Sequence, residues 1–156
     1  MSVKDFVQQR RDALIAMRRD FHMYPEPAWL EYRSAAKVAD RLISLGYDVA
    51  LGADVLDLDS RMGLPSDEVM KAAMDRAIKE GANPELVEKM GYGKTAIVAT
   101  MKFGGEGPVV AFRVDMDSND VIEAKEDSHV PTKEGFRSCH DKACLLYTSD
   151  AADDSL

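Results

Sequence analysis

The chain has 156 residues, 46% hydrophobic and 31% charged, with a formal net charge of −8 at pH 7. These values are ordinary for one globular domain. An acidic chain without a basic block is a poor candidate for binding nucleic acid, and no apolar run approaches the length that spans a bilayer. The charged N-terminal segment lacks a signal-peptide core, so we expect a cytoplasmic protein.

Two helices and a short strand are predicted in the first third of the chain. Apolar residues recur at helical spacing over residues 6–21, with arginine and aspartate on the other face. Pro25 ends this helix, because a proline disfavours helical backbone just before itself. A second apolar stripe predicts a helix over residues 31–45, with Gly46 as its C-terminal cap. Residues 47–51 then read as a short strand.

A helical insertion is predicted over residues 66–90. Ser66 and the acids after it are typical of a helix N-terminus, and Gly81 ends that helix. Residues 84–90 predict a short further helix. Both segments are charged and carry a thin apolar stripe, so we expect the insertion to lie on the surface.

The sharpest strand signals come next. Residues 94–103 (KTAIVATMKF) are rich in β-branched side chains, and the glycines and proline of residues 104–108 predict a hairpin turn. Residues 109–114 (VVAFRV) are nearly all apolar, which predicts a central strand. Two helices followed by a hairpin and a central strand predict a layered α/β domain.

Asp115 and Asp117 are the leading candidates for chemistry. They follow the apolar strand at its C-terminal end, the usual place for a site in an α/β sheet, and their spacing puts both carboxylates on one face. Such a pair can hold a metal, orient a histidine or tune each other's pKa. The pattern also allows a plainer role, in which the acids cap the strand end and bind loop amides.

Three other polar groups attract attention. Cys139-His140-Asp141 offers zinc-type ligands, but adjacent residues rarely chelate one ion, so an ordinary loop is the favoured interpretation. His22 and Glu26 lie at the end of the first predicted helix, where we expect a structural role. His129 is either a substrate contact or a solvated loop residue, and the sequence does not choose.

The C-terminal tail has an unusual sequence. Residues 144–153 read CLLYTSDAAD, which resembles one reading frame of the transposase adapter used to build sequencing libraries. We therefore treat residues 144–156 as a non-native tail and residues 1–143 as part of a catalytic domain. Outside the tail, Cys139 is the single cysteine, so no internal disulfide is expected.

Several segments in order resemble a known family. RRDFHMYPEPAWLEYRSAAKVADRLISLGYDV and GKTAIVATMKFGGEGPVVAFRVDMDSND are similar to the opening of the zinc-type amidohydrolases and carboxypeptidases related to aminoacylase. SRMGLPSDEV and GFRSC resemble the branch of p-aminobenzoyl-glutamate hydrolase A subunits and indole-3-acetyl-aspartate hydrolases. The resemblance covers nearly all of residues 1–143.

The resemblance implies the N-terminal, incomplete part of a zinc-peptidase-like three-layer domain. The parent enzyme would hydrolyse the amide bond of an N-acyl or aryl amino acid with water activated by two Zn²⁺ or Mn²⁺ ions, and would form a homodimer or hetero-oligomer. Asp115 and Asp117 match its catalytic-site aspartates. The main metal-binding motif falls after Ala143, so we assign no metal ligand to this chain and expect it to bind no metal and to be inactive alone.

Two alternatives remain open. An apolar strand that ends in Asp115 and Asp117 also resembles the haloacid-dehalogenase-like phosphatases, with Asp115 as nucleophile, Asp117 as acid/base and a bound Mg²⁺. Against this, that family has Thr or Val where this chain has Asn119. The other alternative is a non-catalytic interaction module that uses the charged helices of residues 66–90.

Overall fold

The computed structural model describes residues 2–119 and 122–140. These residues form two compact units. The first unit comprises residues 2–25, 118–119 and 122–140, and the second comprises residues 26–117. No helix among the described residues combines the length and the apolar character that crossing a membrane requires.

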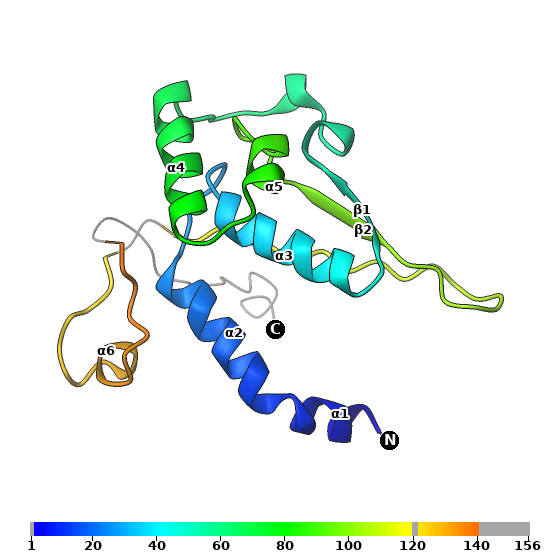
Figure 1. Cartoon of the computed structure of the whole chain (residues 1–156), viewed down its shortest axis with the longest axis horizontal. Coiled ribbons are helices and arrows are strands. Elements are labelled where there is room, and N and C mark those ends of the chain that lie inside the picture. The colour runs from blue at the N-terminus through cyan, green and yellow to red at the C-terminus, as the bar shows by residue number, and fades with distance from the viewer. Residues whose placement is uncertain (1, 120–121, 141–156) are drawn as a thin grey trace, which may run out of the picture. The chain divides into compact units, whose positions relative to one another are not determined.

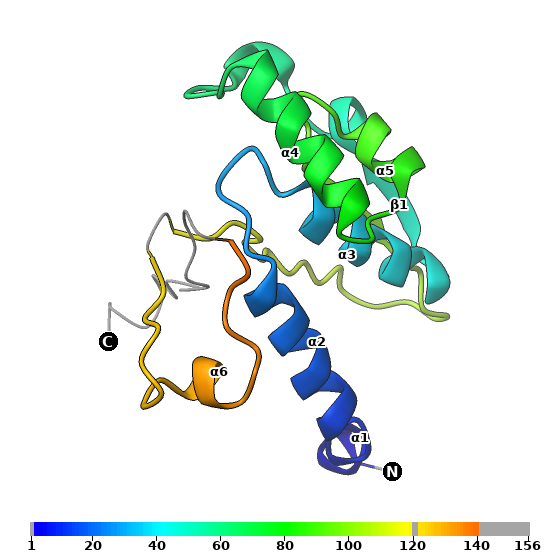
Figure 2. The ribbon, with the colours of Figure 1, turned by 60° about the vertical axis from the view of Figure 1, so that its left-hand side comes forward.

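Helix α3 (Tyr32–Ser44) is the centre of the second unit. It contacts both strands, β1 (Asp48–Leu51) and β2 (Ile97–Thr100), and both helices of the following segment, α4 (Asp67–Lys79) and α5 (Pro84–Lys89). Figures 1 and 2 show this arrangement. The predicted helices over residues 31–45, 66–80 and 84–90 and the strand over residues 47–51 are confirmed to within a few residues.

Both ends of α3 are fixed by identifiable hydrogen bonds. At the C-terminus Gly46 has φ +85°, a backbone conformation that favours glycine, and the amide of Tyr47 donates to the Leu42 carbonyl at 3.1 Å. At the N-terminus the buried Glu26 carboxylate accepts from the amides of Arg33 (2.9 Å) and Ser34 (2.7 Å). Glu26 therefore caps a helix that begins six residues later.

The predicted insertion is part of the core rather than a surface feature. More than half of the buried apolar cluster comes from residues 66–90, and the small side chains of α3 let these helices approach closely. The thin apolar stripe is enough to pack these helices into the core because methionines fill the space between the helices. The cluster consists of Leu30, Tyr32, Ala35, Ala36, Ala39, Met70, Ala73, Met74, Ala77, Ala82, Leu86, Val87 and Met90.

The predicted hairpin and central strand are wrong. β2 pairs antiparallel with β1, with Asp48 opposite Thr100 and Leu51 opposite Ile97. Residues 109–114 form no strand, and no backbone hydrogen bond joins them to another described segment. A central strand requires neighbours for its N–H and C=O groups, and the described chain supplies none here. The mixed α/β character is confirmed, whereas the three-layer domain stays a prediction.

The first unit is mainly helical and has little apolar core. The helix predicted over residues 6–21 is two helices, α1 (Val3–Gln9) and α2 (Arg11–Met23), which meet at Arg10. Ser2 caps α1 through the amide of Asp5. Short pieces complete the described chain: α6 (Val130–Lys133) in this unit, and the 3₁₀ turns η1 (Gly52–Asp54) and η2 (Leu58–Ser60) in the second unit.

Replacing Glu26 by alanine should destabilise the second unit. The change leaves the buried amides of Arg33 and Ser34 without acceptors, which costs about 1–3 kcal/mol. The free energy of unfolding in urea measures the effect. Glu88→Ala, on the exposed surface of α5, is the matched control and should change stability by less than about 0.5 kcal/mol. Equal losses in the two variants would remove the capping role from Glu26.

Residues 103–114 should drive self-association of the chain. Val109 is 97% exposed and Phe112 is 89% exposed, and such apolar, strand-forming surface promotes edge pairing. We expect Val110→Lys combined with Phe112→Lys to raise the monomer fraction in sedimentation velocity. Met62→Lys removes an equally exposed apolar side chain (83%) elsewhere and should leave association unchanged. An identical shift in both variants would contradict a specific role for this segment.

Candidate active site

Asp115 and Asp117 line a cavity of about 340 Å³ in the second unit. The structure thus brings both predicted site residues to one hollow, although the strand expected to carry them is absent. A third acid, Glu31, and the aromatic ring of Trp29 lie on the same cavity. The complete lining is Ala28, Trp29, Glu31, Leu56, Thr95, Ala96, Val114, Asp115, Met116 and Asp117.

Asp115 and Asp117 are both exposed, and they differ in their neighbours. The Arg113 guanidinium donates to Asp115 Oδ1 at 2.8 Å, and both side chains of this pair face solvent. An exposed ion pair of this kind contributes little to stability. Asp117 lies close enough to Glu31 for their charges to repel. Neither aspartate is held by a buried cation, so both can act on a group that enters the cavity.

Glu31 is the site residue that the sequence interpretation missed. Its Oε2 accepts a hydrogen bond from the Thr95 hydroxyl at 2.8 Å. Burial raises the pKa of Glu31 above its ordinary value, the bond from Thr95 lowers it, and the charge of Asp117 raises it again. A carboxyl perturbed by both burial and a like charge is a typical functional-site feature. Its position at the start of α3 offered no local sign of this.

Trp29 holds an unusual backbone conformation next to Glu31. Its φ is +68°, which is rare for a bulky side chain and costs of order 1–3 kcal/mol. The indole Nε1 donates to the Met62 carbonyl at 3.1 Å, which ties this turn to the loop after η2. Together with the Glu26 cap, that bond fixes the turn over residues 26–31 and sets where the Glu31 carboxylate points.

The described residues do not fit a complete two-metal centre. The cavity offers carboxylate oxygens but no imidazole or thiolate. Within the described part of the chain, Asp115 and Asp117 belong to no set of three ligand atoms that lie within 4.8 Å of one another. Two-metal sites need several converging ligands for each ion, so the cavity by itself supplies at most a fraction of such a site.

Most of the other candidate residues lie in the first unit, whereas Glu26 caps α3 in the second. His22 and His129 both contact the carboxylate of Glu123, a residue that the sequence interpretation did not single out. Cys139 and His140 make hydrogen bonds to the backbone carbonyls of Met23 and Pro25, as expected of an ordered loop. Asp141 and the predicted tail over residues 144–156 lie outside the described residues.

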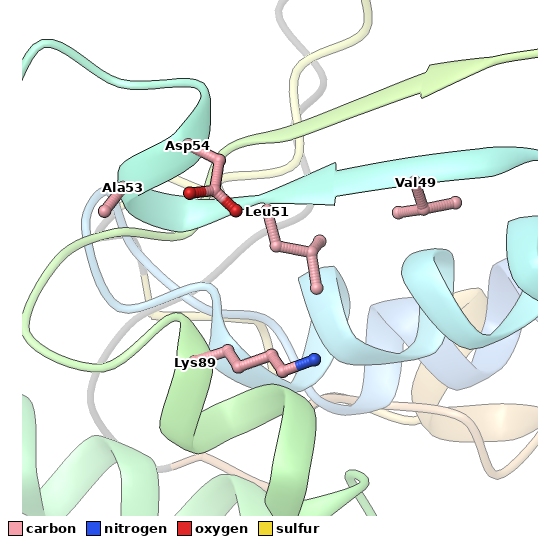
Figure 3. Close-up of a pocket in the computed structure, with 5 residues that line it drawn as sticks. All are labelled: Val49, Leu51, Ala53, Asp54 and Lys89. Carbon is pink, nitrogen blue, oxygen red and sulfur yellow. The ribbon is translucent and has the colours of Figure 1, made fainter.

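A second hollow, of about 250 Å³, lies between β1, η1 and α5. Figure 3 shows Leu51 on its floor, with Asp54 and Lys89 reaching in from different elements. Among the described residues, neither the side chain of Asp54 nor that of Lys89 forms a hydrogen bond or ion pair. One acidic and one basic side chain on an open surface do not form a catalytic site by themselves, so the cavity of Asp115 and Asp117 is the better candidate.

Comparison with known proteins identifies relatives of this chain. Over 139 residues, which are 89% of the chain, it is 44% identical to a p-aminobenzoyl-glutamate hydrolase subunit of Escherichia coli. The two proteins are homologues. The chain is also 43% identical over 138 residues to the indole-3-acetyl-aspartic acid hydrolase of Enterobacter agglomerans. The chain spans only about a third (32%) of the length of each of these relatives.

A solved structure supports the same relationship. The aminobenzoyl-glutamate utilization protein of Klebsiella pneumoniae matches 77% of the chain with a TM-score of 0.74 and 45% sequence identity. The match covers 30% of that protein. No protein-family model matches the chain. The predicted resemblance to this branch of hydrolases is therefore confirmed, over a segment that is one third of the relatives' length.

The pKa of Glu31 should respond in opposite directions to its two neighbours. Asp117→Asn removes a repelling charge and should lower the pKa, whereas Thr95→Val removes a stabilising hydrogen bond and should raise it. Carboxyl ¹³C chemical shifts followed through a pH titration measure both. Glu106→Gln, in the exposed turn after β2, is the control and should leave the pKa of Glu31 unchanged. An unchanged Glu31 pKa in the Asp117→Asn variant would show that the two acids do not interact.

Proposed function

We propose that this chain is the N-terminal part of a metal-dependent amidohydrolase. Its substrates are N-acyl or aryl amino acids of the p-aminobenzoyl-glutamate or indole-3-acetyl-aspartate type. The supporting observation is the 44% identity over 139 residues to a p-aminobenzoyl-glutamate hydrolase, together with the acidic cavity in the matching fold. The acyl group and the amino acid rest on the names of the relatives, and the Zn²⁺ or Mn²⁺ ions rest on the resemblance of the sequence to zinc-type amidohydrolases.

Asp115 and Asp117 are the residues of this chain that we assign to the active site. Both carboxylates face the cavity without a buried cationic partner, so they are available as acceptors for groups that the remaining two thirds of the enzyme bring. A carboxylate in that position orients an imidazole and fixes its tautomer. The described lining of the cavity contains no imidazole or thiolate, so we expect that the chain does not hydrolyse the substrate by itself.

A chimera tests this proposal. Residues 1–143 are joined to the part of the Escherichia coli relative that follows the aligned segment, and release of p-aminobenzoate from p-aminobenzoyl-glutamate is measured with added Mn²⁺. We expect the chimera to hydrolyse the substrate and the isolated chain to show none of this activity. In the chimera, Asp117→Asn should lower kcat/KM by about 10- to 100-fold, the usual cost of losing an outer-shell carboxylate.

Two controls give the result its meaning. Glu106→Gln in the chimera should keep full activity, because that residue lies in an exposed turn away from the cavity. p-Nitrophenyl phosphate tests the phosphatase alternative and should not be cleaved. Hydrolysis by the isolated chain, or an Asp117→Asn chimera with unchanged kcat/KM, would falsify the assignment.

A further inference from the structure

A buried carboxylate joins two histidines in the first unit. Glu123 is 3% exposed, and its Oε1 lies 2.7 Å from His22 Nε2 and 2.8 Å from His129 Nε2. The other oxygen, Oε2, accepts from the amide of Ser138 at 2.6 Å. Three donors from three places in the chain therefore converge on one side chain. We call His22, Glu123 and His129 the clasp, and residues 122–140 the strap.

The strap depends on these polar contacts because it has little apolar core. Among the described residues of the first unit, Phe136 and Pro25 are the buried apolar side chains, and Phe136 is the one that the strap contributes. Phe136 packs edge-on against the ring of His22, with centroids 5.4 Å apart. The strap is also held at the end of α2, where the amide of Cys139 donates to the Met23 carbonyl at 3.0 Å.

The geometry sets which atoms donate and which accept in the clasp. A carboxylate has no hydrogen to donate, so both Nε2 atoms carry hydrogens that point at Glu123. His22 Nδ1 is buried without a hydrogen-bond partner among the described residues. The negative charge of Glu123 is therefore what holds the two imidazoles and the Ser138 amide in place.

Other charged groups near the clasp do not replace Glu123. Arg19 of α2 pairs with Glu134 and lies over the Phe136 ring at 4.5 Å. Arg137 donates to the backbone carbonyls of Glu123 (3.2 Å) and Ala124 (3.0 Å) rather than to a carboxylate. The ionised side chain of Glu123 is the shared acceptor of the cluster.

We propose that the clasp is an acid-sensitive fastener that holds the strap on the end of α2 and releases it as a local unit. Protonation of Glu123 removes the charge that all three donors share. The strap then keeps its contacts to backbone carbonyls but loses its buried anchor. The second unit contains no equivalent cluster in its described residues and stays folded when the strap opens.

The direction of the pH effect follows from the surroundings of each acid. Burial alone would raise the pKa of Glu123, but bonds from His22, Ser138 and His129 outweigh burial and lower it. A lowered pKa means that the stabilisation is complete above the ordinary glutamate value of 4.5 and is lost as the pH falls through the folded value. In the second unit, burial raises the pKa of Glu26 and Glu31, so acid does not remove stability through them.

Amide hydrogen exchange on the whole chain tests the clasp. The reporters are the amides of Ser138 and Cys139, and the reference is the buried amide of Gly93, which donates to the Tyr32 hydroxyl at 2.9 Å in the second unit. Glu123→Gln places an amide donor against one of its former partners. We expect protection at Ser138 and Cys139 to fall about 10- to 100-fold while Gly93 keeps its protection.

A matched variant and a pH series complete the test. Glu134→Gln, an exposed acid of the same strap, should change protection at Ser138 by less than about threefold. In the unmodified chain, protection at Ser138 should fall below pH 4.5 before that at Gly93 does. The proposal is overturned if Glu123→Gln leaves Ser138 protected, or if Gly93 and Ser138 lose protection together in the variant or in acid. The pH series decides the question even if the variant fails to fold.

Discussion

The buried carboxylate of Glu26 is the constraint on which the second unit depends. It accepts the first free amides of α3 and so fixes where the central helix begins. Because α3 contacts both strands and both helices of the unit, a shift in the residue at which it begins would displace the whole core. The cap lies outside the helix in sequence, so the chain must turn between residues 26 and 32. That turn carries Trp29 and Glu31, and the cap therefore also shapes the cavity.

The cavity is built by this turn and by the chain near β2. Thr95, just before β2, donates to Glu31, while Met116 packs against the core and lies between the two aspartates. The result is an acidic hollow with an aromatic edge but without imidazole. The chain matches about a third of the length of its relatives, so the cavity is at most part of any site that they share.

The sequence predicted features that depend on neighbouring residues and missed those that depend on distant ones. α3, α4 and α5 could be predicted because their apolar stripes, Ser66 and Gly46 are local signals. The central strand predicted over residues 109–114 is wrong because such a strand needs sheet neighbours that the described chain does not provide. Asp115 and Asp117 could be found from a short motif, whereas Glu31 is linked to the cavity by a bond across 64 residues, and Glu123 meets His22 across 101.

The buried acids of the two units show why burial alone does not decide the charge of a carboxyl group. Glu26 and Glu123 are both almost fully buried, yet the pKa of Glu26 is raised and that of Glu123 is lowered. Glu26 receives backbone amides at the start of a helix, and burial dominates. Glu123 receives two imidazoles as well as an amide, and these donors outweigh burial. Protonation of Glu26 therefore costs the folded state no stability, whereas protonation of Glu123 removes the stabilisation that the two imidazoles and the amide give its charged form.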